Sequence, residues 1–377
     1  MNRACRYLLA LAAGACALRA SPLLVFIGTG AGGIYSVRFD SADGSLAAPV
    51  RAARSPRPGF LASDPDGRRL YAACELDPGL AVRPGAGGVS AFAIDRGTGL
   101  LAFLNQRPSG AGAPAHVVVD ATGRMVIAAD YAGGTICAWP ILSDGRLGER
   151  SSLVRHSGAP GPNRLRQESP HPHSVTLSPD NRFAVACDLG LDRVFCYRID
   201  PGRASLAAAE PRFAAVPRGL GPRHAKFSSD GRQLYVLNEM GGSICMFGRD
   251  PATGALVLRQ TVSTLPSGFR GANLSAEIRI DARGRFVYAS NRGPDSIAVF
   301  SRDPGRGTLS LVQIVPSGGR QPRNFALSPD GRWLLCANRG TNDLTVFSVD
   351  PSTGFLAATA HRVAVPQPIC VLFPGPG

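Results

Sequence analysis

The chain has 377 residues and a formal net charge of +14, with 41 Lys and Arg against 27 Asp and Glu. Lys226 is the only lysine, so arginines carry nearly all of the positive charge. They are spread along the whole chain without a run of five or six, which argues against a nucleic-acid partner and favours an ordinary basic surface.

Residues 1–20 have the composition of a secretory signal peptide. Arginines precede an apolar stretch from Leu8 to Leu18, and small residues up to Ala20 would allow cleavage. The stretch is too short to span a bilayer comfortably, so no stable membrane insertion is expected after its removal. Cys16 leaves a lipoprotein anchor open, although the Leu that usually stands three residues earlier is missing. We expect an exported protein, periplasmic or secreted, if the signal is real, and a cytoplasmic protein otherwise.

The following segment contains the pattern G-x-G-x-x-G over residues 28–33. A dinucleotide site needs a helix N-terminus directly after these glycines, because the helix amides bind the pyrophosphate. The next residues, Ile34 to Phe39, instead alternate and are rich in β-forming residues. The pattern therefore predicts a β-hairpin, and no cofactor is expected.

A repeat of about fifty residues runs through the rest of the chain. Its turns, of the type Asp-Gly-Arg, fall at residues 66–68, 123–124, 180–182, 230–232, 284–285 and 330–332. Each turn is followed by an apolar run, a short polar or Gly-rich turn and a second apolar run, which is typical of antiparallel strands. Because seven copies share residues 21–377, each has about 51 residues, the size of a four-stranded propeller blade.

These repeats predict an all-β fold, a single seven-bladed β-propeller over residues 21–377. One domain is favoured over two because each repeat needs its neighbours to bury its faces. The first copy lacks a preceding strand, whereas the chain ends in a strand around residues 367–373 with nothing after it. We expect this C-terminal strand to pair with the N-terminal blade and close the ring. Neither Gly-His nor Trp-Asp punctuates the repeats, which argues against a WD-type propeller.

The nine cysteines would suggest disulfides in an exported protein. Six of them, however, recur at equivalent places in their repeats, in the second or the third strand: Cys74, Cys187 and Cys336, and Cys137, Cys196 and Cys245. Equivalent positions in neighbouring blades are too far apart for a disulfide. We therefore expect buried free thiols.

Aligned repeats bring two sets of residues to one mouth of the propeller. The starts of the inner strands supply His116, His173, Arg223, His224, Glu277, Arg323 and Asn324, with His171 close by. The ends of the second strands supply Glu75, Asp130, Asp188, Glu239, Arg292 and Arg339. Repetition alone would put the same residue at each place, so the unequal charges need another cause, and such a mouth is a usual ligand site.

Not all of these residues are interpreted as functional. Glu75, Asp130 and Asp188 are expected only to solvate a water-filled channel, and His116 is expected to be a hydrogen-bonded histidine at a strand end. A functional cluster is expected where two adjacent blades bring imidazoles, a guanidinium and a carboxylate together: His171, His173, Arg223, His224 and Glu239. Imidazole and carboxylate could bind zinc, but zinc-finger spacings are absent and Arg223 would repel a cation, so no metal is expected.

The phrases HPHSVTLSPDNR, GPRHAKFSSDGRQLYVLNE and SAEIRIDARGRFVYASNRGPDSIAVF contain these residues. They resemble the lactonase family of seven-bladed propellers, which includes bacterial propeller-type 6-phosphogluconolactonases and fungal carboxy-muconate lactonizing enzymes. The resemblance covers the chain after its first segment. It implies functional roles for His173, Arg223, Glu239 and, less directly, Arg292.

The resemblance implies hydrolysis of a sugar lactone such as 6-phosphogluconolactone. Glu239 would take a proton from water as the water attacks the ring carbonyl. Arg223, helped by His173 or His224, would stabilise the oxyanion and protonate the leaving ring oxygen. The planar fork of arginine suits the substrate's phosphate or carboxylate. The expected substrate-binding set is Arg292, Arg323, Arg339, Asn324, His171 and Glu277.

An alternative from another class is an exported propeller that only binds a ligand or a protein partner. A pure scaffold has no need of His173, Arg223, His224 and Glu239 together, whereas a lactonase has. The expected partner is therefore a small-molecule lactone, and the chain is expected to be a monomer.

Overall fold

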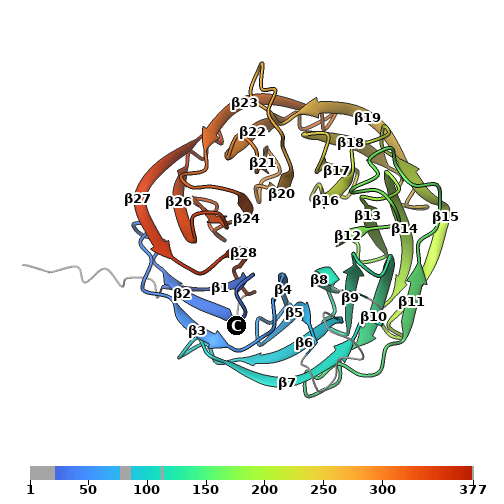
Figure 1. Cartoon of the computed structure of the whole chain (residues 1–377), viewed down its shortest axis with the longest axis horizontal. Coiled ribbons are helices and arrows are strands. Elements are labelled where there is room, and N and C mark those ends of the chain that lie inside the picture. Colours follow the sequence, from blue (N-terminus) through green and yellow to red (C-terminus); the bar gives the residue numbers. More distant parts are fainter. Residues whose placement is uncertain (1–21, 77–85, 111, 113, 376–377) are drawn as a thin grey trace, which may run out of the picture.

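The computed structural model describes residues 22–76, 86–110, 112 and 114–375, and all regular secondary structure within them is β-strand. The strands form seven four-stranded antiparallel sheets, which stand like blades around a central axis (Figure 1). The prediction of a seven-bladed propeller is confirmed. Residues 1–20, and with them the predicted signal peptide, lie outside the described residues.

Each blade has an inner strand at the axis and a second strand beside it (Figure 1). The inner strands are β4 (Phe60–Ser63), β8 (Pro114–Val119), β12 (Pro172–Leu177), β16 (Pro222–Phe227), β20 (Ser275–Ile280), β24 (Pro322–Leu327) and β28 (Pro368–Leu372). The second strands are β5 (Arg69–Glu75), β9 (Met125–Asp130), β13 (Phe183–Asp188), β17 (Gln233–Asn238), β21 (Phe286–Asn291), β25 (Trp333–Asn338) and β1 (Leu23–Thr29).

The third and fourth strands complete the blades toward the rim. The third strands are β6 (Gly87–Ile94), β10 (Thr135–Pro140), β14 (Arg193–Asp200), β18 (Ser243–Arg249), β22 (Ser296–Arg302), β26 (Asp343–Val349) and β2 (Ile34–Phe39). The outer strands are β7 (Leu101–Pro108), β11 (Ser152–Arg155), β15 (Ser205–Ala215), β19 (Leu256–Ser263), β23 (Leu309–Pro316), β27 (Leu356–Ala364) and β3 (Val50–Ala53).

The two ends of the chain share one blade, as predicted. β28 pairs antiparallel with β1, with Ile27 opposite Val371 and Phe26 opposite Leu372. The red and blue ends of the ribbon accordingly lie side by side in Figure 1. This pairing closes the ring and gives the inner strand of the last blade its partner.

The first two strands explain the glycine pattern. β1 and β2 pair as an antiparallel hairpin from Leu23 opposite Phe39 to Gly28 opposite Ile34, and no helix follows. The prediction of a β-hairpin at this pattern is confirmed. No helix within the described ranges is long and apolar enough to cross a membrane.

Burial differs between the layers of a blade. All six residues of β9 are buried, because neighbouring blades cover both faces of a second strand. The outer strand β27 instead alternates between exposed and less exposed residues. A strand covered on both faces reads as a continuous apolar run, whereas a strand with one wet face alternates. All seven cysteines in the described part of the chain are buried and free, as expected.

Buried tyrosines connect neighbouring blades through hydrogen bonds. The hydroxyl of Tyr288 in β21 donates to the carbonyl oxygen of Gly354 at 3.0 Å, in the turn between β26 and β27. Tyr235 in β17 donates in the same way to Gly307 at 2.7 Å, and it also accepts a hydrogen bond from Nε of Arg302 at 2.7 Å. Both tyrosines are fully buried.

Replacing Tyr288 by Phe is expected to lower the free energy of unfolding by about 1 kcal/mol, because the Gly354 carbonyl loses its buried donor. Tyr235→Phe is expected to cost about 2 kcal/mol, since the charged Arg302 loses its acceptor as well. Denaturant unfolding of the two variants tests the difference. Equal stability of the two variants would contradict this account of the tyrosines.

Candidate active site

A register shift marks the start of six of the seven inner strands, and in five of them it leaves a single bulged residue out of the ladder. In β16, Pro222 pairs with Asn238 and His224 with Leu237, so Arg223 has no partner in the ladder. The same shift leaves four equivalent residues unpaired: Ala115, His173, Arg323 and Ile369. Because a bulge re-aims the extra side chain, the starts of these inner strands split into two layers.

The outer of these layers borders a cavity of about 380 Å³, which we call the mouth cavity. Four of the five bulged residues line it, together with residues at the ends of the second strands. Its charged and aromatic wall consists of Arg57, Glu75, Tyr131, Arg166, His173, Glu239, Arg292, Arg323 and Arg339. Five arginines thus face two carboxylates, and the mouth cavity is strongly cationic.

Glu239, which directly follows β17, lies at the centre of the charges in the mouth cavity. Its Oε2 is 2.8 Å from Nε of Arg223 and 3.0 Å from Nη2 of Arg292. Its Oε1 forms an ion pair with Arg166. Nε2 of His173 is 3.9 Å from Oε2, which is too long for a hydrogen bond. The carboxylate is therefore buried but held by three guanidiniums from three different elements.

These guanidiniums set the protonation state of Glu239. Burial alone raises the pKa of the carboxyl, but the charges of Arg292, Arg223 and Arg166 outweigh burial and hold the pKa below its usual range. Glu239 is therefore ionised at neutral pH. An ionised carboxylate at the wall of a cavity is able to accept a proton or to balance a positive charge.

His173 is the only histidine in the wall of the mouth cavity among the described residues. Burial and the neighbouring charge of Arg223 hold the pKa of its imidazole well below the usual range. Its Nδ1 is buried, and no hydrogen-bond partner for it is found in the described part of the chain. The imidazole is therefore neutral, and its other ring nitrogen, Nε2, is the one nearer to Glu239.

Arg323 and Arg339 are the arginines of the wall for which the described residues supply no ion pair. Burial and the charges of Arg223 and Arg292 hold the pKa of Arg323 well below its usual range. Burial, with Arg223, likewise lowers the pKa of Arg292, to about 10. Such crowded guanidiniums are stabilised by an anion, and their planar forks suit a phosphate or a carboxylate.

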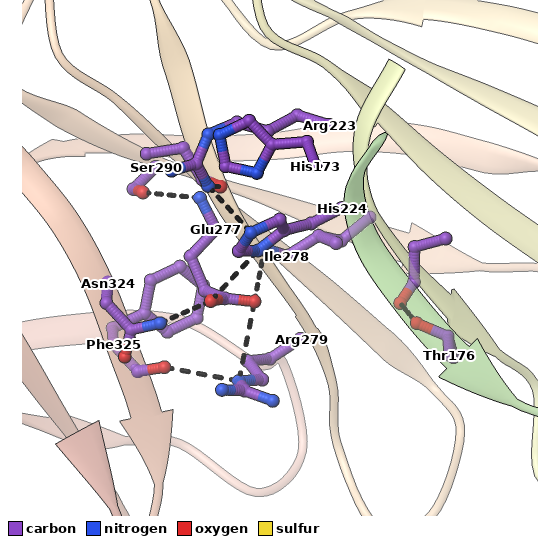
Figure 2. Close-up of polar contacts among 12 residues, drawn as sticks. His173, Thr176, Arg223, His224, Glu277, Ile278, Arg279, Ser290, Asn324 and Phe325 are labelled. Atoms are coloured by element: carbon purple, nitrogen blue, oxygen red, sulfur yellow. Dashed lines mark hydrogen bonds and ion pairs between the residues drawn. The ribbon is translucent and has the colours of Figure 1, made fainter. Parts of the chain in front are cut away.

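Three predicted site residues lie in the inner layer, beneath the mouth cavity, and do not line it: His224, Glu277 and Asn324. Figure 2 shows how they connect, with Glu277 between His224 and Asn324. Nδ1 of His224 is 3.2 Å from Oε2 of Glu277, and the amide of Asn324 donates to the same oxygen. Arg223 contacts this layer from above through its hydrogen bond with Nε2 of His224, at 3.0 Å.

His171 also lies behind the wall. Its ring stacks on Tyr131 with the centroids 4.3 Å apart, and its Nδ1 is 3.0 Å from the Tyr131 carbonyl oxygen. Its Nε2 is 2.8 Å from the carboxylate of Glu168. His171 therefore supports Tyr131, which does line the mouth cavity, and it does not face the cavity itself.

The interpretation of Asp130 and Asp188 as acids that solvate a channel is wrong, because both are fully buried. The carboxylate of Asp188 is 2.6 Å from Nδ1 of His156 and accepts the backbone N–H of Leu191 at 3.1 Å. The carboxylate of Asp130 accepts backbone N–H groups of its own loop, such as that of Gly133 at 2.9 Å. These acids bind amides that would otherwise be unsatisfied, and so they shape the loops around the mouth.

The interpretations of Glu75 and His116 have different outcomes. Glu75 lines the mouth cavity and pairs with Arg57 at 2.7 Å, so it is a mouth residue as expected. His116 was expected to form hydrogen bonds, but its ring stacks on Phe60 at 3.8 Å. Its Nδ1 has no hydrogen-bond partner within the described ranges. Packing on an aromatic ring therefore fixes this imidazole.

Arg166 and Tyr131 are site residues that the repeat alignment did not find. Arg166 comes from the long connection between β11 and β12, which has no equivalent position in other blades. The buried amide of Gln167 anchors this connection by donating to the Leu189 carbonyl at 2.8 Å and to Asp192 at 2.9 Å. The unusual length of the connection was the one signal in the sequence that set it apart.

The described residues contain no group of three or more His, Cys, Asp or Glu side chains that could hold a metal ion.

The sequence model of a family described as "Lactonase, 7-bladed beta-propeller" matches residues 24–373. The chain belongs to the seven-bladed β-propeller lactonase family. It is therefore an enzyme of the lactonase class, and membership favours this class over a propeller that only binds.

Named relatives of this lactonase agree with the assignment. A protein of Bacillus subtilis named 6-phosphogluconolactonase is 34% identical over 92% of this chain and 97% of its own length. A 6-phosphogluconolactonase of Formosa agariphila is 29% identical over 72% and 75% of the two chains. The solved structure of a periplasmic gluconolactonase of Pseudomonas aeruginosa is 35% identical, with a TM-score of 0.87 over 94% of this chain and 99% of that one.

Proposed function

We propose that the protein hydrolyses an anionic sugar lactone, similar to 6-phosphogluconolactone, to the corresponding acid. The observation that carries the proposal is the mouth cavity, in which five arginines face two carboxylates and Glu239 lies beside a neutral His173. Family membership supports the reaction class, and the names of the Bacillus and Formosa relatives support the substrate class.

In this mechanism Arg323 and Arg339 bind the anionic group of the substrate, because they face the mouth cavity and form no ion pair with an acid in the described part of the chain. The substrate also competes for Arg166, whose side chain is 38% exposed and reaches Glu239 from a loop. When Arg166 turns to the anion, Oε1 of Glu239 is released. That oxygen is then free to accept a proton from a water molecule.

The water oxygen bonds to the lactone carbonyl carbon while its proton passes to Glu239. His173 and Arg292 stabilise the oxyanion that forms, because both line the mouth cavity next to Glu239. The bond to the ring oxygen then breaks, and that oxygen takes the proton from Glu239. Arg223 lies outside the wall, so we assign it the orientation of Glu239 in place of the oxyanion role expected from the sequence.

The test is base titration of acid release by the purified protein from δ-gluconolactone and from freshly made 6-phosphogluconolactone. We expect acceleration above the spontaneous rate, with a higher kcat/KM for the phosphorylated substrate. No acceleration of either lactone would refute the proposal.

Replacing Arg323 by Ala is expected to raise KM for 6-phosphogluconolactone about tenfold and to leave KM for δ-gluconolactone within about twofold, because one charge-assisted contact to the anion is lost. Arg57→Ala is the matched control, since Arg57 already pairs with Glu75 in the same wall. Equal changes in KM for both lactones would show that Arg323 does not bind the anion.

We also infer export and a monomeric state. Export is supported by the composition of residues 1–20, and cell fractionation tests it. Size-exclusion chromatography with light scattering tests the oligomeric state.

A further inference from the structure

Glu277 is the one carboxylate in the inner layer beneath the mouth cavity, where the other blades carry Phe60, His116, Ser174, His224, Asn324 and Cys370. It is fully buried. Every polar contact to its carboxylate comes from a donor: Nδ1 of His224 at 3.2 Å, the amide of Asn324, the backbone N–H of Ile278 at 3.1 Å and, more distantly, Arg279 at 3.7 Å. The proposed mechanism so far gives this buried side chain no task.

The hydrogen bonds around Glu277 fix the tautomer of His224. A guanidinium only donates, so Nε2 of His224 must accept from Nη1 of Arg223 at 3.0 Å and carries no proton. The proton of the neutral imidazole is then on Nδ1, which faces Glu277. Asn324 is fixed in the same way, because its Oδ1 accepts the N–H of Val371 at 2.8 Å and its Nδ2 therefore faces Glu277.

We propose that Glu277 and His224 are positioning residues of the hydrolytic site, which hold Arg223 and through it Glu239. Each member of the chain Glu277, His224, Arg223, Glu239 binds the next, and Figure 2 shows the first three in contact. His224 and Glu277 do not line the mouth cavity, so they act without touching the substrate. The inference rests on the proposed function, and it assigns these two residues roles different from catalysis and substrate binding.

The positive charge on Arg223 explains why this series of four residues begins with a carboxylate, Glu277, on the side of His224 that faces away from Arg223. Nη1 of Arg223 is held by the Ala276 carbonyl oxygen and by His224, and its Nε by Glu239. Burial, followed by the charge of Arg223, keeps the pKa of His224 well below the usual range. A protonated His224 would turn an N–H toward the guanidinium and break the contact, and Glu277 provides the acceptor that keeps the single proton on Nδ1.

The tautomer is measured directly by two-bond ¹H–¹⁵N correlation spectra of the protein labelled in its histidine side chains. The signals of His224 are assigned as those missing in His224→Gln. We expect the Nδ1–H tautomer at neutral pH. A predominant Nε2–H tautomer would overturn the proposal, and this result does not depend on whether a lactone is turned over.

A double-mutant cycle tests the role in catalysis. His224→Phe is expected to lower kcat about 30-fold with KM changed less than about twofold, as is usual for partners that orient a functional group. In the Arg223→Ala background the same change is expected to cost less than about twofold, because His224 acts through Arg223. Additive losses in the two backgrounds would show that His224 acts on the substrate by itself, and would refute the proposal.

A conservative variant separates positioning from proton transfer and from simple loss of structure. In His224→Gln, the amide oxygen accepts from Arg223 and the amide nitrogen donates to Glu277, so the loss in kcat is expected to stay within about fivefold. Equal losses in His224→Gln and His224→Phe, with both folded in thermal unfolding, would contradict the positioning role. His116→Phe is the matched control, a buried histidine of the same layer that is expected to change kcat less than about twofold.

Discussion

Replacing Glu239 by Gln is expected to lower kcat about a thousandfold, because the amide has the shape of the carboxylate but cannot take the proton of the attacking water. The amide nitrogen would also turn donors toward the guanidiniums that hold Glu239 in place: Arg166, Arg223 and Arg292. Initial rates of acid release at saturating substrate measure the loss.

Glu75→Gln is the matched control for this variant, since Glu75 lies in the same wall but, among the described residues, forms an ion pair only with Arg57. Its kcat is expected to stay within about threefold of that of the parent protein. If Glu239→Gln kept turnover within tenfold of the parent, Glu239 would not be the base, and the mechanism would have to begin from His173.

The Glu239→Gln variant is also expected to change how the stability of the protein depends on pH. The pKa of Glu239 is depressed in the folded protein, so its contribution is fully present above the pKa of the unfolded chain, about 4.3, and is lost as pH falls through the folded pKa. The melting temperature of Glu239→Gln should therefore fall less steeply below pH 4 than that of the parent. Parallel melting curves of the two proteins would indicate that the arginines do not hold the carboxylate ionised.

Replacing Arg223 by Ala is expected to lower kcat about a hundredfold, because Glu239 loses the contact that orients Oε2 and a small displacement of a catalytic group is costly. The variant is also expected to lose about 3 kcal/mol of stability, since a fully buried cation is removed from between Glu239 and His224. Titration assays and thermal unfolding of the same preparation separate the two effects.

Added guanidinium ion should restore part of the activity of Arg223→Ala, because the cavity left by the side chain opens toward Glu239. Arg223→Lys serves as the charge-matched control, and it is expected to remain at least tenfold slower than the parent. An ammonium cannot contact Glu239, His224 and the Ala276 carbonyl oxygen in the way that the guanidinium does. Full activity of Arg223→Lys would show that only a positive charge is needed at this position.

The ring could be predicted from the sequence because its signals are local and repeated. Each Asp-Gly-Arg turn precedes a second strand, as at Asp230 before β17, and the unaccompanied strand at the C-terminus predicted closure with β1. Glu239 and Arg292 were found for the same reason, since both directly follow a second strand. The position of a residue in the repeat is sufficient to predict its location where the backbone conformation also repeats from blade to blade.

The division of the site into two layers could not be predicted from the repeats. It depends on the bulges, which turn His173 and Arg323 into the mouth cavity while the residues directly after them point beneath it. The residues on either side of each bulge give no sign of this register shift in the sequence. Arg166 was missed for another reason, because its loop belongs to one blade only and its approach to Glu239 is a purely tertiary contact.

Asp188 shows that the position of an acid in the repeat does not by itself predict its role. It follows the same pattern as Glu239, at the end of a second strand, yet its carboxylate turns to backbone amides and to His156. Glu239 is one residue further along the turn and meets three arginines instead. The surrounding partners, and not the strand position, decide which acid faces the ligand.

The bulged positions also bear on how such a propeller can acquire new substrates. A bulged residue takes no part in the hydrogen-bonded ladder, so a change of its side chain costs the blade no backbone pairing. The five positions already hold very different side chains on one repeated backbone: Ala115, His173, Arg223, Arg323 and Ile369. Substrate specificity can therefore change through substitutions at the mouth, while the closed ring, held by its strands and buried tyrosines, remains stable.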